Sequence, residues 1–456
     1  MALYDAYGRK VEPAALAREQ ARPTMAGVRN IYSVTHPSVG LTPERLFAVL
    51  STAEFGDPFL YLELAEEMEE KDLHYLAVLN TRKATCAQLD LIVKPASSAA
   101  VDQRAADLVR ACLRAPGLDL ESILFDVLDA IGKGFSATEI VWDRQGPEWT
   151  PERLVWRDPK WFMFDWIGGS ELLVRTLRDE QSIDPSRGES DAAHFKKGWS
   201  AALSGIQPLT APLAPFKFLV HVAKAKSGLP IRGGVARAAA WSWLFKNFLL
   251  KDWLGYSEVY GQPVRVGKYG PGASEQDKQT LLQAVTNIGA DAAAVIPESM
   301  AIEFEQARAG VGAGGDLYMQ FCEYLDAQVS KAVLGQTLTT ELPRAGGSRA
   351  AAMVHEMVRR DILAADARRL ASTLTRDLVK PIVDLNLGEQ SVYPRVSLGL
   401  PDDIDDKVFA DIIGEMADRG LEVGQGVVRD RLGLPDPAPR EKLLHPKQTI
   451  TEKTGS

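Results

Sequence analysis

Hydrophobic residues recur at helical spacing through the first and last thirds of the chain, and at strand spacing in the middle. Thr42-Pro43 opens one predicted helix, and Asp57-Pro58 opens a long helical stretch, Phe59–Leu89. In the middle, Gly or Pro separates short alternating runs that predict strands. These runs are Ala137–Asp143, Arg153–Arg157, Trp161–Ile167, Glu171–Leu177 and Phe216–Val222. The pattern predicts an α+β fold in which a β-rich unit stands between helical ones.

One predicted helix, Val235–Tyr260, is apolar on more than one face. Its large apolar side chains are Trp241, Trp243, Leu244, Phe245, Phe248, Leu249, Leu250, Trp253 and Leu254. A helix that is apolar nearly all round has to be covered on several sides, either by the rest of a monomer or by neighbouring subunits. Its longest uncharged run, Ala238–Phe245, is far shorter than the roughly 20 residues of a membrane span, so no membrane segment is expected.

Further elements follow from the same periodicities. Predicted strands are Leu89–Val93, Pro263–Gly267, Ala293–Ile296 and Ala301–Glu305, and predicted helices are Asp102–Leu113, Leu120–Ile131, Glu275–Ile288, Leu317–Leu334 and Ser348–Val379. The last of these helices is expected to stop before Pro381. The first 30 residues lack any period and are expected to form a flexible arm. The acidic residues between Glu63 and Asp72 are expected to form a solvated face.

Composition narrows the class of protein. The 456-residue chain is 46% hydrophobic and 25% charged, which are the values of a folded globular protein. Its net charge of −9 offers no basic face for general electrostatic binding of nucleic acid. Cys86, Cys112 and Cys322 lie far apart without a CxxC pair, so neither a disulfide framework nor a zinc cage is expected. Such cysteines suit a reducing compartment, and the cytoplasm is the expected one.

One glycine-rich turn, Gly310–Gly315, satisfies the GxGxxG pattern and leaves a dinucleotide-dependent oxidoreductase as an alternative function. Two features argue against this function. Gln306–Gly310 separates the preceding strand from the turn, and no acidic residue stands at the end of a second strand, where it would bind the ribose of the cofactor. Gly228–Gly233 lacks the lysine of a phosphate loop, and His355-Glu356 lacks a second metal ligand at position 359. No catalytic residue, cofactor or metal is therefore expected.

Arginines recur along the predicted helix Ser348–Val379. They are Arg349, Arg359, Arg360, Arg368, Arg369 and Arg376. They can line a path for DNA, or they can pair with acids such as Asp361 and Asp366 three or four residues away. The sequence leaves both interpretations open.

Specific strings of the chain resemble the Mu-like phage portal proteins. The most specific is the segment 318–340, which ends in Leu-Gly-Gln-Thr-Leu-Thr-Thr. Tyr260–Tyr269, Gly347-Ser348 leading into Val354-His355, and Arg157-Asp158-Pro159 support it. The similarity covers most of the chain, from about residue 30 to about residue 435.

This resemblance implies a ring of subunits, usually twelve, at one vertex of a capsid. The family has wing, stem, clip and crown regions, which can be carried over by position. Residues 1–30 are then the arm, 31–136 the helical wing with a strand, 137–232 the clip with flanking strands, 233–260 the stem helix, 261–334 an α+β wing or core, 335–347 the tunnel loop, 348–397 a long helix leading to the crown, and 398–456 the crown and tail.

The resemblance also implies a function, a channel for packaging and ejecting double-stranded DNA without sequence specificity and without enzymatic activity. Implied partners are further copies of the chain, the terminase large subunit, a neck or adaptor protein, and the major capsid and scaffold proteins. Residues implied at the channel are Thr339, Thr340, Glu341, Arg344 and Arg349, and those implied between subunits are Trp241, Phe245, Phe248 and Trp253. The implied location is the portal vertex of the virion, and before assembly the host cytoplasm.

An acidic chain suits such a channel, because every retained phosphate contact would slow the sliding of DNA. A monomeric DNA-binding protein stays as a further alternative, and it predicts strongly salt-dependent binding to duplex DNA by a single subunit.

Overall fold

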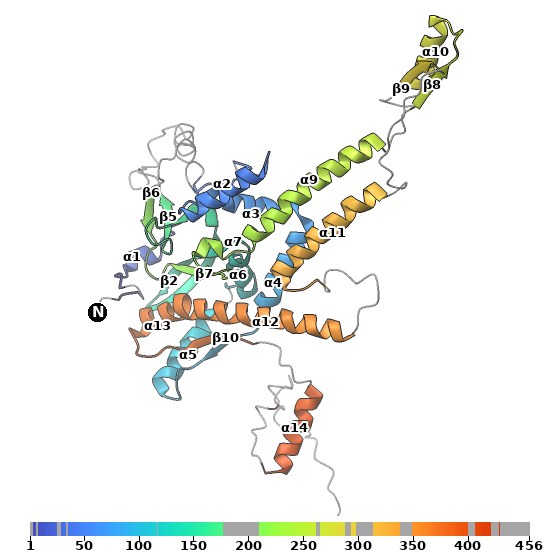
Figure 1. Cartoon of the computed structure of the whole chain (residues 1–456). Coiled ribbons are helices and arrows are strands. Elements are labelled where there is room, and N and C mark those ends of the chain that lie inside the picture. Colours follow the sequence, from blue (N-terminus) through green and yellow to red (C-terminus); the bar gives the residue numbers. More distant parts are fainter. Residues whose placement is uncertain are drawn as a thin grey trace, which may run out of the picture. The chain divides into compact units, whose positions relative to one another are not determined.

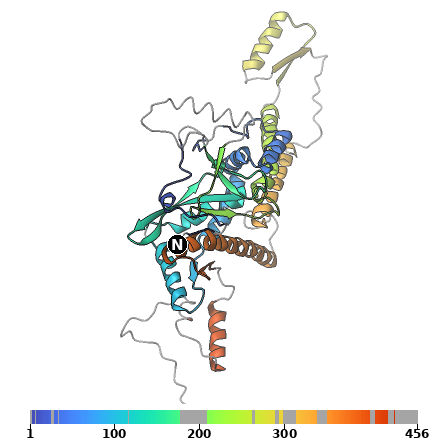
Figure 2. The same ribbon diagram turned by 90° about the vertical axis from the view of Figure 1, so that its left-hand side faces the viewer.

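The computed structural model describes residues 3–5, 8–24, 29–32, 35–115, 117–176, 209–260, 265–287, 293–297, 313–337, 349–399, 406–420 and 428. The chain divides into two compact units, residues 1–399, hereafter the body, and residues 400–456. The body combines helices with short sheets, as Figures 1 and 2 show. The predicted fold class, α+β, is confirmed.

The first third of the body is helical, as predicted. Its main helices are α2 (Pro43–Glu54), α3 (Phe59–Lys71), α4 (Leu73–Ala87), α5 (Ala100–Leu113), α6 (Leu120–Val127) and the short α7 (Ala130–Lys133). The Thr42 side chain caps α2 by accepting a hydrogen bond from the Arg45 amide. The stretch predicted from Phe59 is broken at Asp72, whose carboxylate caps α4 at the amides of His74 and Tyr75.

Two three-stranded antiparallel sheets follow. One has the order β3-β2-β7, from β2 (Phe135–Gln145), β3 (Glu148–Arg157) and β7 (Phe218–Val222). The other has the order β4-β5-β6, from β4 (Phe162–Phe164), β5 (Leu172–Thr176) and β6 (Leu209–Pro212). The 3₁₀ turns η1 (Pro159–Trp161) and η2 (Pro230–Arg232) lie beside them in sequence.

The described strands within residues 137–232 are not a separate unit. Trp142, Phe162 and Leu219 are buried in the same hydrophobic core as Leu62 of α3 and Leu79 of α4. The strands expected between the helical segments are present, and they share the core of the helices because they supply the apolar face on which the helices pack.

The expected flexible arm, residues 1–30, is also different in the structure. It contains the short helix α1 (Pro13–Leu16), and both Leu16 and Ala21 are buried. The buried carboxylate of Glu139 in β2 accepts hydrogen bonds from the amides of Gln20 and Ala21. A backbone segment that lacks periodicity can still be fixed when a buried charge binds its amides, which a periodicity argument does not detect.

Two long helices, α9 (Ala236–Tyr260) and α11 (Ala313–Leu334), pack side by side in an antiparallel pair (Figures 1 and 2). The chain between them contains β8 (Arg265–Tyr269), α10 (Glu275–Asn287) and β9 (Ala293–Pro297). β8 and β9 are parallel, and α10 is the crossover between them. The predicted strand Ala301–Glu305 lies outside the described residues.

The helix predicted to stop before Pro381 continues past it. α12 (Arg349–Leu374) runs into a π-helical turn, η3 (Thr375–Val379), and then into α13 (Lys380–Leu387). Pro381 stands in the first turn of α13, where its missing amide N–H costs little, and the wider π turn makes the change of register. Beyond α13, β10 (Arg395–Leu398) pairs antiparallel with β1 (Leu91–Lys94).

The acidic stretch of α3 is not a solvated face. Glu63 and Glu67 are buried, as is Asp72 just beyond the helix. The second unit contributes α14 (Asp406–Asp418) to the described residues, so most of the predicted crown and tail, 398–456, lies outside them.

Candidate subunit interface and channel residues

Most of the residues implied at the channel lie outside the described residues, namely Thr339, Thr340, Glu341 and Arg344. Arg349 is the first residue of α12. The helix end before this segment is well defined. Gly335, which follows α11, has a φ of +72°, and a Cβ there would lie 2.7 Å from Ile362 Cδ1 and 2.8 Å from Val358 Cγ1 of α12. The end of α11 is thus packed tightly against α12.

The four residues implied between stem helices fall into two pairs. Trp241 packs against the core of its own chain, and Trp253 stacks on Tyr318 of α11, with ring centroids 6.4 Å apart. Phe245 and Phe248 are 44% and 40% exposed. Phe245 and Phe248 are thus exposed in one subunit, whereas Trp241 and Trp253 are half-buried.

Exposed apolar side chains occupy two flanks of α9. Leu250 and Leu254 are exposed like Phe245 and Phe248. At 3.6 residues per turn, Leu250 lies about 160° around the helix from Phe248. A single neighbouring surface cannot cover both flanks.

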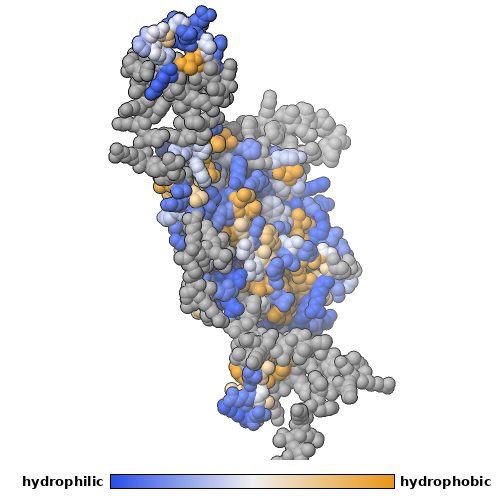
Figure 3. All heavy atoms as spheres, turned by 90° about the vertical axis from the view of Figure 1, so that its right-hand side faces the viewer, coloured by the Kyte–Doolittle hydropathy of each residue, from blue (hydrophilic) through white to orange (hydrophobic). Residues whose placement is uncertain are grey.

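An apolar stripe on α11 was missed by the sequence reasoning. Leu317, Phe321 and Tyr324 are all exposed, and Phe321 and Tyr324 have ring centroids 6.3 Å apart. Their spacing of four and then three residues places them on one face of a helix, which is the signal that the sequence carries. Figure 3 shows hydrophobic side chains among hydrophilic ones on the side of the body where these long helices lie.

A half-buried cation holds the base of the helix pair. Lys246 Nζ of α9 lies 2.6 Å from Asp326 Oδ1 of α11 and 3.1 Å from Asp72 Oδ1. Partial burial lowers the pKa of Lys246. The hydrogen bond to Asp326 and the charge of Asp72 raise it by more, so the net pKa lies above its ordinary value. Lys246 therefore stays charged and links α9, α11 and the start of α4.

A second charged network lies beneath α3. Glu66 contacts Lys133 of α7 at 3.5 Å and Lys160 of η1 at 3.6 Å. Lys133 also binds Asp129 at 2.9 Å, and Lys160 binds Asp158 at 2.9 Å. Burial and the charge of Glu66 raise the pKa of Asp158 to about 6. The network fixes α3, α7 and η1 to one another, so these acids are structural.

Arginines of α12 form ion pairs with acidic residues of the same helix. Arg359 binds Glu356 at 2.8 Å, and Arg369 lies 3.5 Å from Asp366. Asp366 also receives two hydrogen bonds from Arg82 of α4, at 2.7 and 3.0 Å. For these side chains the structure supports ion pairing within the chain.

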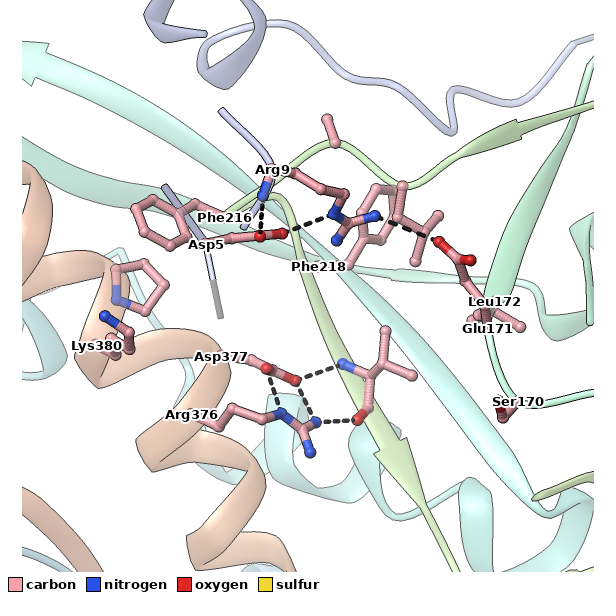
Figure 4. Close-up of a pocket in the computed structure, with 14 residues that line it drawn as sticks. Asp5, Arg9, Ser170, Glu171, Leu172, Phe216, Phe218, Arg376, Asp377 and Lys380 are labelled. Atoms are coloured by element: carbon pink, nitrogen blue, oxygen red, sulfur yellow. Dashed lines mark hydrogen bonds and ion pairs between the residues drawn. The ribbon is translucent and has the colours of Figure 1, made fainter. Parts of the chain in front are cut away.

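A pocket of about 600 Å³ lies between β7, the start of β5 and the π turn (Figure 4). Most of its charged side chains bind one another, with Arg9 between Asp5 and Glu171, and Arg376 on Asp377. Lys380 binds Asp384 instead. Arg376 and Asp377 also bind the backbone carbonyl and amide of Val220, at 2.8 and 3.0 Å. These two side chains occupy the place of a further strand and protect the edge of β7.

The alternative site, Gly310–Gly315, lies partly outside the described residues, and its last residues form the first turn of α11. Within the described ranges, the parallel pairing found is that of β8 with β9, whereas a dinucleotide fold needs a larger parallel sheet. No helix in the described part of the chain is long and apolar enough to cross a membrane.

Comparisons with known proteins agree with the resemblance. The family model for the portal protein of Mu bacteriophage matches residues 62–434. The Mu-like prophage FluMu protein gp29 of Haemophilus influenzae is 35% identical over 415 residues, which cover 90% of this chain and 74% of the relative. The portal protein of Escherichia phage Mu is 33% identical over the same shares.

Two solved structures are also similar to this chain, both from gene transfer agent particles. One, from the virion of the native particle, has a TM-score of 0.43 and 12% identity, and the other, from the neck of the empty particle, has 0.42 and 13%. In each case the match covers 86% of this chain and 94% of the other. From the family match over most of its length, and from relatives at 33–35% identity, the chain belongs to the portal protein family of Mu-like bacteriophages.

Proposed function

We propose that this chain forms the ring-shaped portal at one vertex of a Mu-like phage or prophage capsid, through which double-stranded DNA is packaged and ejected. Family membership supports the proposal, and the observation that carries it is the exposed apolar surface on two flanks of α9 and along α11. A closed ring requires each subunit to present two different, complementary surfaces. Twelve copies is the number that the resemblance implies.

The stem contact in this ring is between unlike helix faces. Phe245 and Phe248 of one subunit pack on the Leu317, Phe321 and Tyr324 stripe of the next. Each of these side chains is 40% exposed or more in a single subunit, so burying them in the ring is favourable by about 25 cal/mol for each Å² of apolar surface. Trp241 and Trp253 support the interface from behind.

Charge substitution tests this contact. Phe248→Glu and Phe321→Glu are each expected to abolish rings while the chain stays folded, because a carboxylate would be buried without a partner. Ile167→Glu is the control, since Ile167 is an exposed apolar residue that lies outside both helices. Mass by light scattering and rings in negative-stain images are the measurements. Normal rings from both helix variants would contradict the proposed stem contact.

The part of the chain that docks other particle proteins is proposed to be β8-α10-β9, in place of residues 137–232. Strands within 137–232 are built into the hydrophobic core, whereas β8, α10 and β9 are connected to the body through α9 and α11. The terminase large subunit and a neck or adaptor protein are the proposed partners there, and the capsid and scaffold proteins are proposed to contact the body. Removing residues 262–311 should leave rings but abolish terminase binding in pull-down assays.

The segment 335–347 is proposed to face the DNA, carrying Thr339, Thr340, Glu341 and Arg344, with Arg349 at the start of α12. The packed junction of Gly335 with Val358 and Ile362 supports this by fixing where the segment leaves α11. The protein itself performs no covalent chemistry in this proposal, and a separate chain supplies the ATPase. A Thr340→Ala/Arg344→Ala variant should form rings but retain less DNA per particle. Unchanged DNA content would remove these residues from the channel.

A further inference from the structure

A tight loop of the body, residues 165–170 between β4 and β5, presents two large apolar side chains to solvent. Trp166 is 50% exposed, and Ile167 is fully exposed. Phe55, which follows α2, is 73% exposed. Single exposed apolar residues are ordinary, but a group of them that includes a tryptophan is typical of a protein–protein contact, where tryptophan often carries much of the binding energy.

The three side chains belong to one surface. The carbonyl of Gly56 accepts a hydrogen bond from the Phe164 amide at 3.3 Å, which joins the end of α2 to β4. A Cβ on Gly56 would lie 3.6 Å from Trp166 Cδ2, so the indole ring lies beside the residue that follows Phe55. Phe55, Trp166 and Ile167 are hereafter called the apolar patch.

Hydrogen bonds hold the loop in one conformation. The Asp165 carboxylate accepts them from three amides of the same loop, those of Gly168, Ser170 and Glu171. These bonds, with the one from Gly168 first, hold the pKa of Asp165 below its ordinary value, so the carboxylate stays charged at neutral pH. A loop that is already ordered loses little conformational freedom when a partner binds, which favours binding.

Exposed cations lie beside the apolar patch. Leu229 contacts the loop, because a Cβ on Gly169 would lie 2.7 Å from Leu229 Cδ2. The segment that leads to Leu229 contains Lys224 and Lys226, and both lysines are exposed. A partner that covers the loop therefore meets positive charge at its border.

Two acids of the same surface are already bound within the chain. Asp57, two residues after Phe55, binds Arg175 at 2.5 Å, and Glu54 binds Arg237 at 2.5 Å. They do not neutralise the two lysines. On a chain whose net charge is −9, this surface favours a partner that brings carboxylates around an apolar centre.

We propose that the apolar patch, bordered by Lys224 and Lys226, is the docking site for the major capsid protein, which binds it through an apolar pocket edged with carboxylates. The inference rests on the proposed function, in which the body borders the capsid shell. The ring contact is proposed on α9 and α11, and terminase and neck binding on β8-α10-β9, so neither needs this surface. Duplex DNA has no apolar pocket for Ile167, which favours a protein partner.

Binding of the purified major capsid protein of the same phage to assembled full-length rings tests the site. Trp166→Ala and Ile167→Glu should each weaken binding by at least about 30-fold, as expected for the centre of an interface. Lys224→Glu/Lys226→Glu should weaken binding by about tenfold at low salt and by less at high salt, because exposed charges are screened. All of these variants should still form rings, because the patch lies outside α9 and α11.

Val101→Glu and Lys94→Glu are the matched controls. Val101 of α5 is 60% exposed, Lys94 of β1 is exposed, and neither belongs to the loop, to the end of α2 or to the segment before Leu229. Both variants should bind the capsid protein as the natural ring does. A loss of binding in the controls equal to that in the patch variants would overturn the assignment to this surface.

The remaining outcomes are distinct. Natural rings that do not bind the capsid protein, or patch variants that bind it normally, would overturn the docking site. Variants that lose only the scaffold protein or duplex DNA would also overturn it. If the natural chain forms no rings, the proposed function fails, and the same titration of the single subunit with the capsid protein then decides whether the patch binds it.

Discussion

Lys246 offers the sharpest test of how the helix pair is held to the body. It binds Asp326 and Asp72 at 2.6 and 3.1 Å, and its side chain is 17% exposed, with 20% and 3% for the two carboxylates. Lys246→Met keeps the apolar stem of the side chain and removes the cation. Asp72 then keeps only its capping bonds to α4, and Asp326 loses its partner.

The size of the effect follows from the burial. Removing one partner of a buried ion pair costs about 3–5 kcal/mol, and hydrogen bonds to charged groups contribute about 1.5–3 kcal/mol each. Because Lys246 and Asp326 keep some contact with water, we expect the lower end, about 3 kcal/mol. At about 1.4 kcal/mol for each factor of ten, the amides of α9 and α11 near this contact should exchange with deuterium about 100-fold faster.

Hydrogen–deuterium exchange followed by mass spectrometry on assembled rings measures this directly. Lys278→Met is the control, because Lys278 of α10 contacts the exposed Glu275 and the Tyr269 ring of β8. It should leave exchange in α9 and α11 unchanged. Adding Asp326→Asn to Lys246→Met should recover part of the loss, since an uncompensated carboxylate is removed. Less than a threefold change for Lys246→Met would refute the assignment of Lys246 as the link between these helices.

Three further predictions concern the body. Burial lowers the pKa of His221 to about 4. The free energy of unfolding should therefore be at its maximum above pH 6.5 and should fall by up to about 3 kcal/mol towards pH 4. His221→Asn should flatten that slope in urea titrations, and an equal slope in both proteins would contradict the assignment. Glu139→Gln leaves Arg157 and Lys217 without the carboxylate that they share, and it should lower the free energy of unfolding by about 3–5 kcal/mol. The loss should be seen as early proteolysis within residues 13–24, and unchanged resistance to protease would count against it. Gly234→Ala would put a Cβ 2.3 Å from the Gly132 carbonyl oxygen and should lower stability by at least about 2 kcal/mol in thermal unfolding, and an unchanged midpoint would exclude this close packing.

Local signals in the sequence were sufficient for the long elements. The helix predicted as Val235–Tyr260 is observed as Ala236–Tyr260, and the one predicted as Glu275–Ile288 is observed as Glu275–Asn287. Ser274 caps the second of these helices, with Ser274 Oγ 2.7 Å from Asp277 Oδ2. The pairing of Arg359 with Glu356 also follows from spacing along one helix. Each of these features depends on residues within one or two turns of one another.

Features that depend on distant partners could not be predicted. The acids of α3 look like a solvated face until Lys133 and Lys160 are placed beneath them. The N-terminal segment looks flexible until Glu139 is placed under its amides. The stripe with Phe321 was not predicted for a different reason. A helix with some apolar surface is ordinary, and only the fold shows that Leu317, Phe321 and Tyr324 stay exposed within the described part of the chain.

The pairing of β1 with β10 has a consequence for how the chain is made. Leu91 lies opposite Leu398, so a strand near the start of the body waits for its partner until almost the whole body has been synthesised. Such distant contacts slow folding, and until they form β1 presents an open edge that can join other unfinished chains. A chain that stalls or is cleaved before Arg395 leaves this edge permanently open. In the proposed ring, assembly is expected to start from completed subunits, and truncated chains are expected to aggregate.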